Sequence, residues 1–493
     1  MKRISASFLP PIALETNGEL PMYRQLSEWF RRAIIGGQLK AGQRVPSSRH
    51  LAAELKISRI SVSSAYEQLC AEGYLETFVG AGTCVASSIP GEALKPALEK
   101  IRGTSRPVSK NKAPRIVSKR VALMRVPPET WLRKLVAFRV SLPALEHFPT
   151  EVWAKLVNRH ARRATRQSMA YGDAMGYMPL REATAEYLGT VRAVRCEPSQ
   201  VLITTGSQQG LQLSAQVLLD AGERVWIEEP GYPGARQALV MAGALLVPVP
   251  VDQDGLNVSE GVRRAGRARA VSITPSHQYP LGVTMSATRR MELLNWAARS
   301  GSWIIEDDYD SEYRLGGRPI PSLQGLDTGE RVIYVGTFSK VMFPALRLGY
   351  MVVPEDLVDA FYTARDATDQ FSSTLYQAAM TDFIRDGHFA RHIRRMRTLY
   401  LERRTALVEA IQNQTKGKLE VIGAEAGMHL VAMLPPGVSD IAVSKKAAAI
   451  GISAMPLSSC YLKAPIRGGL ILGYGGTDVR QIRDGMRKLA TVV

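Results

Sequence analysis

The stretch Val332–Tyr350, VIYVGTFSKVMFPALRLGY, decides the fold of most of this chain. Its first four residues are apolar and rich in β-formers, which predicts a buried strand. The strand runs into Gly336–Ser339, and Lys340 follows at once. Burial of a lysine amine lowers its pKa and makes it nucleophilic. The pattern indicates an amine that can bond covalently to a carbonyl group, although a lysine at the end of a strand is more often only solvated.

A second strand supplies an acid that makes the role of Lys340 specific. Asp307 follows the apolar run Trp303–Ile305. An acid at one strand end and a lysine at another are the pair that pyridoxal 5′-phosphate requires, because the acid keeps the ring nitrogen protonated and the lysine holds the aldehyde as a Schiff base. The run Glu306–Asp308 is alternatively a metal site, but no histidine or further carboxylate has suitable ligand spacing, and we predict no metal.

Strand and helix signals alternate through the C-terminal two thirds of the chain. This alternation predicts an α/β domain with a mostly parallel central sheet flanked by helices. Ligands bind at the carboxyl ends of the strands in such sheets, where Lys340 and Asp307 are expected to meet. The expected strands are 201–204, 225–227, 270–274, 303–305, 332–335 and 349–353, and 209–219 is expected to be a helix.

The first 85 residues show a different pattern. Two short helices are expected on either side of Lys56–Ile57, the second with Ser58 as its N-cap, and this spacing is typical of a helix-turn-helix. A hairpin with a glycine turn, the wing, is expected over Tyr74–Val85. Arg59, near the start of the second of these helices, is available to read base edges. Small helical modules also serve protein contacts, so DNA binding rests on more than this pattern.

Charge and composition narrow the class of protein. The net charge is +18, and residues 86–134 carry half of it, with 12 Lys/Arg against 3 Asp/Glu and six prolines. This stretch is predicted to be an extended tether that attracts phosphate, although plain solubility also explains it. No apolar stretch approaches the ~20 residues of a membrane span, no signal peptide is visible, and the four cysteines form no CxxC pair. We therefore expect a cytoplasmic protein with no membrane association.

Several widely separated motifs carry a family resemblance. GTFSK with RLGY, EDDYDSEY upstream, and PSSRHLAAEL, ISRISVSSAY, EGYL and GAGT near the N-terminus resemble the MocR/GabR family of bacterial regulators. That family joins a GntR-type winged helix-turn-helix to a fold-type I, aminotransferase-like domain that binds pyridoxal 5′-phosphate. The motifs EEPGYPGAR, TPSHQYPLG and EDDYDSEY favour the PdxR-like branch of this family. The expected domains are 15–86 for the winged helix, 87–134 for the linker and 135–493 for the aminotransferase-like effector domain.

The resemblance also implies site residues. For the cofactor they are Ser207, Gln208 and Thr337 at the phosphate, Tyr232 against the ring, Asp307 at the ring nitrogen, Tyr309 or His277 at the phenolic oxygen, Lys340, and Arg347. Tyr279 stands where aminotransferases have an asparagine. For a substrate or effector they are Arg236, Arg347 and Arg467, with Tyr171 and Gly176 in a segment that crosses to the partner's site. For DNA they are Arg49, Ser58, Arg59, Ser61, Ser63 and Gly80.

Together these features predict a transcription regulator. The winged helix binds operator DNA, and the aminotransferase-like domain senses pyridoxal 5′-phosphate, or an amine or amino acid, through an aldimine at Lys340. The resemblance implies a head-to-tail homodimer. The alternative is an active aminotransferase with an accessory DNA-binding module. A scaffold without a cofactor does not explain a lysine, an acid, an aromatic residue and a phosphate loop at strand ends in this order.

Overall fold

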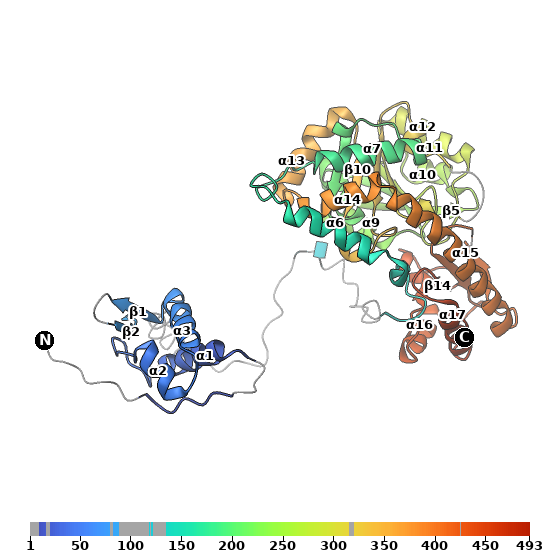
Figure 1. Ribbon diagram of the computed structural model, residues 1–493. Coiled ribbons are helices and arrows are strands. Elements are labelled where there is room, and N and C mark those ends of the chain that lie inside the picture. The colour runs from blue at the N-terminus through green and yellow to red at the C-terminus, as the bar shows by residue number, and fades with distance from the viewer. Residues whose placement is uncertain are drawn as a thin grey trace, which may run out of the picture. The chain divides into compact units, whose positions relative to one another are not determined.

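A computed structural model of the chain describes residues 9–15, 20–78, 82–87, 118, 120–121, 135–314, 320–423 and 425–493. The chain divides into two compact units, Met1–Ile116 and Val117–Val493 (Figure 1). Gly80, and nearly all of the predicted linker 87–134, lie outside the described residues.

The N-terminal unit is a winged helix-turn-helix, as predicted. Ser47 caps one helix by accepting a hydrogen bond from the His50 amide, and Ser58 caps the next through the Ser61 amide. Between the two helices Lys56 adopts a left-handed conformation with φ 52°, which ends the first helix and turns the chain. The elements are α1 (Met22–Ile35), α2 (Ser48–Leu55), α3 (Arg59–Ala71) and the antiparallel strands β1 (Leu75–Phe78) and β2 (Gly82–Val85).

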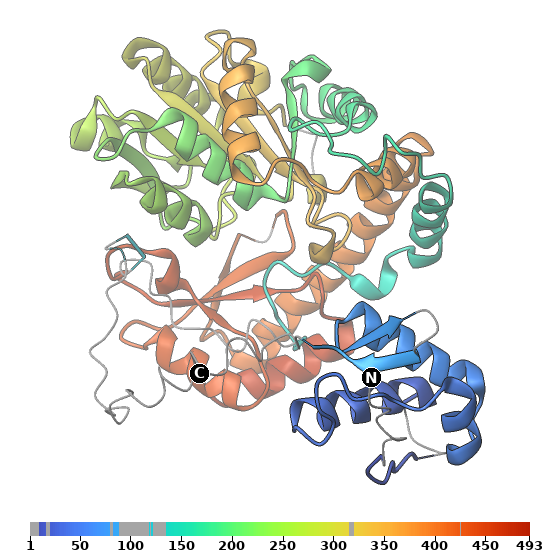
Figure 2. The same ribbon diagram turned by 90° about the vertical axis from the view of Figure 1, so that its left-hand side faces the viewer.

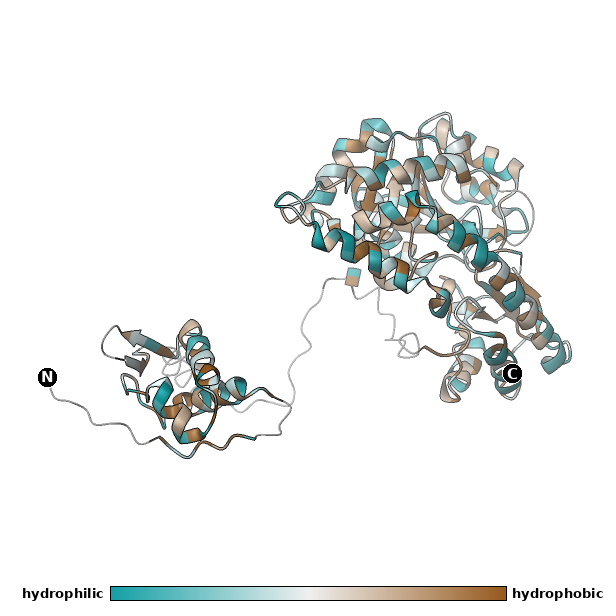
Figure 3. Ribbon diagram, in the orientation of Figure 1, coloured by the Kyte–Doolittle hydropathy of each residue, from teal (hydrophilic) through white to brown (hydrophobic). Residues whose placement is uncertain are grey.

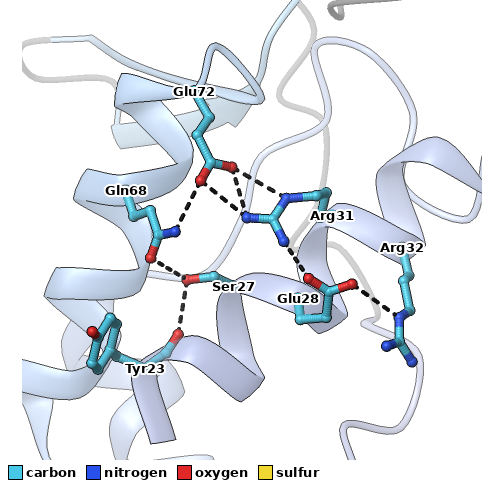
Figure 4. A network of polar contacts seen from close by, with 7 residues as sticks. All are labelled: Tyr23, Ser27, Glu28, Arg31, Arg32, Gln68 and Glu72. Atoms are coloured by element: carbon cyan, nitrogen blue, oxygen red, sulfur yellow. Dashed lines mark hydrogen bonds and ion pairs between the residues drawn. The ribbon is translucent and has the colours of Figure 1, made fainter. Parts of the chain in front are cut away.

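A polar network joins α1 to the end of α3 above an apolar core (Figure 4). The Arg31 guanidinium donates to both carboxylate oxygens of Glu72, with the Nη2–Oε2 distance 2.8 Å. Gln68 Nε2 donates to the same carboxylate at 2.9 Å, and Ser27 Oγ donates to the Tyr23 carbonyl at 2.8 Å. The network fixes the angle between α1 and α3 and leaves the N-terminal end of α3 exposed.

The C-terminal unit is built on an eight-stranded sheet in the order β3-β10-β9-β8-β7-β4-β5-β6. Strands β9, β8, β7, β4 and β5 are mutually parallel, whereas β10 is antiparallel to both neighbours and β6 is antiparallel to β5. All residues of β3, β7, β8, β9 and β10 are buried, as expected for strands covered on both faces. The strands are β3 (Val201–Thr204), β4 (Arg224–Glu229), β5 (Leu245–Asp252), β6 (Gly255–Leu256), β7 (Ala270–Ile273), β8 (Trp303–Asp308), β9 (Val332–Thr337) and β10 (Gly349–Val352).

Helices flank this sheet, with their polar faces outward (Figure 3). The predicted helix after β3 begins at Ser207 rather than at residue 209. The helices are α6 (Thr150–Arg162), α7 (Met178–Arg192), α8 (Ser207–Leu218), α9 (Pro233–Ala242), α10 (Val258–Ala265), α11 (Ala287–Ser300), α12 (Leu323–Leu326), α13 (Val358–Thr368) and α14 (Thr374–Arg385).

A second, smaller sheet was not predicted from the sequence. It is antiparallel, in the order β11-β12-β14-β13, and α15 (His388–Thr415) leads into it from the large sheet (Figure 2). Its strands are only two to five residues long, so they gave little periodic signal. Its elements are β11 (Glu420–Ile422), β12 (His429–Met433), α16 (Asp440–Ala449), β13 (Met455–Pro456), β14 (Gly469–Gly473) and α17 (Val479–Leu489).

Candidate cofactor site and DNA-binding surface

The parallel strands bring predicted residues to one edge of the large sheet. β3 is antiparallel to β10, and β10 to β9, so β3 runs with the parallel set. The carboxyl ends of β3, β4, β7, β8 and β9 therefore meet. The residues that follow them are Ser207 after β3, Tyr232 after β4, His277 after β7, Tyr309 after β8 and Lys340 after β9.

Lys340 and Asp307 come from the ends of adjacent strands. Asp307 pairs with Val335 in the β8–β9 register, and Lys340 lies five residues beyond Val335. The Lys340 Nζ donates to the Ser141 carbonyl at 3.3 Å. Burial lowers the pKa of Lys340, Asp310 and Asp307 oppose that shift, and Arg347 adds to it. The lowered pKa increases the share of neutral amine, which is the nucleophilic form.

The Asp307 side chain is buried and incompletely bonded. It is 4% exposed, and its Oδ1 has no hydrogen-bond partner in the described part of the chain. Burial and the neighbouring Asp308 raise its pKa to about 7, against the opposing charge of Lys340. Buried carboxylate oxygens are normally satisfied, so this one lacks a donor that a protonated ring nitrogen would supply. The residues present therefore fit pyridoxal 5′-phosphate.

The N-terminus of α8 lies where the sequence predicts a phosphate cradle. Gly206 caps α8 with φ 106°, and the first amides of a helix have no acceptor within it. A Cβ on Gly206 would lie 3.3–3.4 Å from the Arg347 guanidinium, so that cation closes the other side of the cradle. Ser207 is the first residue of α8, while Gln208 Nε2 donates to the Gly234 carbonyl at 2.9 Å. Positive charge and free amides thus converge where the resemblance places the phosphate.

The hydroxyl groups of Thr337 and Ser339, shortly before Lys340, differ in their hydrogen bonding. Thr337 Oγ1 accepts a hydrogen bond from the Ser339 amide at 3.1 Å and is buried. Ser339 Oγ is buried and has no partner among the residues described. The sequence prediction included Thr337 and missed Ser339, although its place directly before the lysine was a usable signal.

Aromatic rings form one wall of the site. Tyr232 and Tyr279 make an edge-to-face contact with centroids 5.5 Å apart, and Tyr279 and Tyr309 are 6.0 Å apart. Burial and the charge of Asp307 raise the pKa of Tyr232 to about 12, against the opposing charge of Arg347. Tyr232 therefore lies within electrostatic reach of both the acid and the phosphate end, consistent with a ring-stacking residue. The Tyr279 hydroxyl donates to Met455 Sδ at 3.5 Å, so it does not replace the usual asparagine amide in this arrangement.

His277 bonds to neighbouring side chains. Its Nδ1 lies 2.9 Å from Asp310 Oδ1 and 2.9 Å from Tyr309 Oη. His277 and Asp310 are buried, and Tyr309 is half-buried. Asp310, the residue that the sequence prediction missed here, directly follows Tyr309 in EDDYDSEY.

The structure brings some of the predicted effector residues to the site and not others. Arg236 lines the same cavity as Asp307 and Tyr232, but its guanidinium donates to the carbonyls of Ser459 and Tyr461. Arg467 does not reach the site.

The reason for the displacement of Arg467 is its place in the small sheet. It bonds to Glu420 at 2.7 Å and to the Leu434 carbonyl at 2.6 Å, before the first residue of β14. The other end of β14, Gly473, packs against Arg139, two residues from the Ser141 carbonyl that Lys340 contacts. Since β14 spans roughly 17 Å, Arg467 and Lys340 lie near opposite ends of the strand.

The two predicted residues of the segment expected to cross to a partner differ in their surroundings: Tyr171 is exposed, whereas Gly176 is packed inside the fold. Tyr171 is 85% exposed and contacts the Phe371 ring edge-on. Gly176 instead supports the fold: its φ is 101°, and a Cβ there would meet Ile203 and Gln377. Gly176 therefore does not face an effector within this chain.

The exposed N-terminal end of α3 forms the candidate DNA surface. Arg49, Ser58 and Arg59 are exposed, while Ser63 is half-buried. Ser61 Oγ lies 2.9 Å from Ser58 Oγ, so these two hydroxyls are partly committed to capping. The sequence prediction missed Ile60, which is 78% exposed, more than expected for a large apolar side chain in a small module.

Two family models match the chain. Residues 22–85 match the gntR family of bacterial regulatory proteins, and residues 134–470 match the class I and II aminotransferases. The chain is 40% identical to the probable rhizopine catabolism regulatory protein MocR of Rhizobium meliloti, over 97% of this chain and 95% of that one. The chain belongs to the MocR family of regulators.

Other relatives support the two halves of this MocR-type chain. It is 31% identical to the pyridoxine biosynthesis regulator PdxR of Corynebacterium glutamicum, over 98% of both chains. Its fold is similar to the α-aminoadipate aminotransferase LysN of Thermus thermophilus, with a TM-score of 0.70, 29% identity and coverage of 76% of this chain and 96% of that one. The PdxR-like branch stays a prediction, since the identity to the rhizopine regulator is higher.

The family membership establishes the general function. The protein is a DNA-binding transcription regulator, and its C-terminal unit has the fold of pyridoxal 5′-phosphate-dependent aminotransferases. Across the described residues, no helix is both long and apolar enough to cross a bilayer. In the same part of the chain, no group of three or more His, Cys, Asp or Glu side chains is arranged to hold a metal ion.

Proposed function

We propose that this MocR-type regulator senses pyridoxal 5′-phosphate, or an amine that reacts with it, through Lys340. The observation that carries the proposal is the juxtaposition of Lys340, whose pKa is lowered, with Asp307, whose buried Oδ1 lacks a partner among the described residues. When bound, the cofactor supplies an aldehyde carbon that bonds reversibly to a primary amine. Asp307 would hold the ring nitrogen, Tyr232 would cover the ring, and Ser207, the α8 amides and Arg347 would bind the phosphate.

The protein's own groups also explain how an effector would signal. Lys340 is held at the Ser141 carbonyl, on a segment that packs against the end of β14 in the small sheet. An effector amine that takes the place of Lys340 releases that side chain beside the boundary between the two sheets. A change in how closely the small sheet packs against the large sheet would shift the equilibrium between the DNA-bound and free states of the tethered winged helices.

The α3 surface is proposed to read operator DNA in the cytoplasm. Arg49 and Arg59 are exposed cations suited to phosphate or guanine, and Ser58, Ser61 and Ser63 offer hydroxyls and helix N-terminal amides. Ile60 adds an apolar contact that fits the methyl group of thymine in the major groove. Gly80 would contact DNA from the wing.

The head-to-tail homodimer remains part of the proposal. Its support is the exposed segment before α7, where Tyr171 is 85% exposed and Met169 is 70% exposed. Two large apolar side chains exposed in one short segment are consistent with a surface that a partner subunit covers. Sedimentation of the parent beside a Met169→Glu, Tyr171→Glu variant tests this contact, and an unchanged dimer would argue against it.

An active aminotransferase is the second candidate. Lys340, Asp307 and Arg347 are all in place, and the solved relative LysN is an aminotransferase. Against it, the predicted carboxylate arginine Arg467 is bonded to Glu420 instead. Steady turnover of an amino-acid and keto-acid pair would favour catalysis over sensing.

The deciding experiment compares visible absorption spectra of the purified parent and Lys340→Ala. We expect a visible band in the parent that responds to a particular amine, and no such band in the variant. Operator binding measured in the same samples shows whether that amine changes DNA affinity. A parent that binds no added pyridoxal 5′-phosphate and has no visible band of its own would refute the proposal. The assignment of the DNA-binding module would be unaffected.

A further inference from the structure

We propose that Asp310 and His277 form a hydrogen-bond relay that acts through Tyr309, so that His277 is a positioning residue and does not itself touch the cofactor. The inference rests on the proposed cofactor site. The relay joins the loop after β7 to the residues after β8 with two 2.9 Å contacts at a single atom, His277 Nδ1. His277 and Asp310 are 2% and 1% exposed, so water does not compete for the bond between them.

The surroundings decide which nitrogen of His277 carries the proton. Nδ1 faces two oxygens, whereas Nε2 is buried and has no partner among the described residues. A proton on Nε2 would leave a buried N–H unsatisfied, which is rare, and would turn the Nδ1 lone pair towards the Asp310 carboxylate. A proton on Nδ1 is donated to Asp310 Oδ1 and shared with Tyr309 Oη. Asp310 thus fixes the tautomer, as a carboxylate hydrogen-bonded to a metal-bound histidine does.

This tautomer determines what Tyr309 can do. When Tyr309 Oη accepts from His277, its own O–H is left to donate elsewhere. Tyr309 lies two residues after Asp307, at the edge where the cofactor ring is proposed to lie. The donated bond also makes the phenol a stronger donor, because hydrogen bonds in a chain polarise one another. Tyr309 would therefore hold the cofactor's phenolic oxygen, while the Tyr279 hydroxyl is directed to Met455.

The small sheet closes over the relay. A Cβ on Gly427, just before β12, would collide with the His277 ring and with Asp310 Oδ2, so only glycine fits this approach. The His429 ring is 5.2 Å from His277, and its Nε2 bonds the Pro280 carbonyl at 3.0 Å. The titratable groups facing His277 are Asp310 and Tyr309 from the residues after β8 and His429 from β12. Arg192, Arg314 and Arg397 line the cavity that His277 also borders. Burial lowers the pKa of His429 to about 4, so it stays neutral near pH 7.

The test measures the pH midpoint of the visible band in the cofactor-loaded protein. Tyr309→Phe and His277→Leu should each move the midpoint upward, by about half to one pH unit for His277→Leu, which is the contribution of one hydrogen bond. The reason is that a weaker donor stabilises the ionised phenolic oxygen less. His277→Asn, whose amide reaches the Nδ1 position, should stay near the parent, and His277→Gln, which reaches the Nε2 position, should resemble His277→Leu.

A double variant distinguishes a His277 that acts through Tyr309 from a His277 that contacts the cofactor directly. In a Tyr309→Phe background, His277→Leu should cause no further shift. An equal shift in both backgrounds would overturn the proposal and assign His277 to the cofactor itself. Circular dichroism of each variant controls for folding.

A readout without cofactor keeps the two proposals distinguishable. In the cofactor-free protein labelled with ¹⁵N-histidine, His277 should be protonated at Nδ1, and Asp310→Asn should lose that preference. A proton at Nε2 in the parent would refute the relay. A parent without a visible band would instead refute the proposed function, with the tautomer still deciding the relay.

Discussion

Replacing Asp307 with asparagine should stabilise the cofactor-free protein and weaken its affinity for the cofactor. Burial and Asp308 raise the pKa of Asp307 from 3.8 to about 7. That difference of roughly three units corresponds to at most about 4 kcal/mol of unfolding free energy lost once the carboxyl is charged, at about 1.36 kcal/mol per unit. This upper bound already includes the opposing charge of Lys340, and we expect Asp307→Asn to gain about 1–3 kcal/mol at pH 8.

The sign of the pH dependence follows from the same shift. The pKa of Asp307 is higher in the folded than in the unfolded protein, so folding favours the protonated form, and stability is lost as pH rises through about 7. The advantage of Asp307→Asn should therefore be small at pH 4, grow up to about pH 7 and stay constant above it. Glu228, Glu306 and Glu312 also have pKa values raised by burial, but both proteins contain them and they cancel in the difference.

The assay is urea unfolding of the cofactor-free parent and variant at pH 5 and pH 8, followed by circular dichroism. Asp308→Asn is the matched control on the same strand. Asp308 Oδ2 accepts from Arg192 Nε at 2.8 Å and from Tyr334 Oη at 2.6 Å, so its loss should cost about 3 kcal/mol. Added pyridoxal 5′-phosphate should stabilise the parent more than Asp307→Asn, because ligand stabilisation follows affinity. A variant no more stable than the parent at pH 8, or equally favoured at pH 5, would refute this account of Asp307.

Three further predictions follow from single contacts. Gly206→Ala should weaken cofactor binding about tenfold, because φ is 106° at this position and the new Cβ would contact the Arg347 guanidinium. Gly222→Ala, where φ is 96° and no atom lies near the new Cβ, is the control for backbone strain alone in the same binding titration. Ile60→Ala should reduce affinity for a selected operator about fourfold, and uracil in place of the contacted thymine should matter only to the parent; equal sensitivity in both proteins would exclude the methyl contact. Glu72→Gln should lower the local stability of α1 and α3 by about 0.5–1 kcal/mol, measured by amide hydrogen exchange. The pKa of Glu72 is lowered by its ion pair, so this contribution should be present above about pH 4.5 and disappear as pH falls.

Strong local patterns in the sequence were sufficient to predict the helix-turn-helix and most strands of the large sheet. Uninterrupted apolar runs such as Val332–Val335 predict strands buried on both faces, and the structure has them there. Serine caps and the turn at Lys56 predict the helix-turn-helix. The short strands of the small sheet were not predicted, because two to five residues carry too little periodicity. Apolar side chains of β12 and β14 share one buried cluster with side chains of α15 and α17.

The sequence by itself predicted that Lys340, Asp307, Tyr232 and a phosphate loop belong to one site, because each lies at or shortly after the end of a strand whose direction the alternating pattern predicts. Only the tertiary structure decided which side chains remain available there. Arg467 is bonded to Glu420, and Asp310 meets His277, although 33 residues separate them. These outcomes depend on side-chain hydrogen bonds between segments that are distant in the sequence, and the order of residues along the chain does not reveal such bonds.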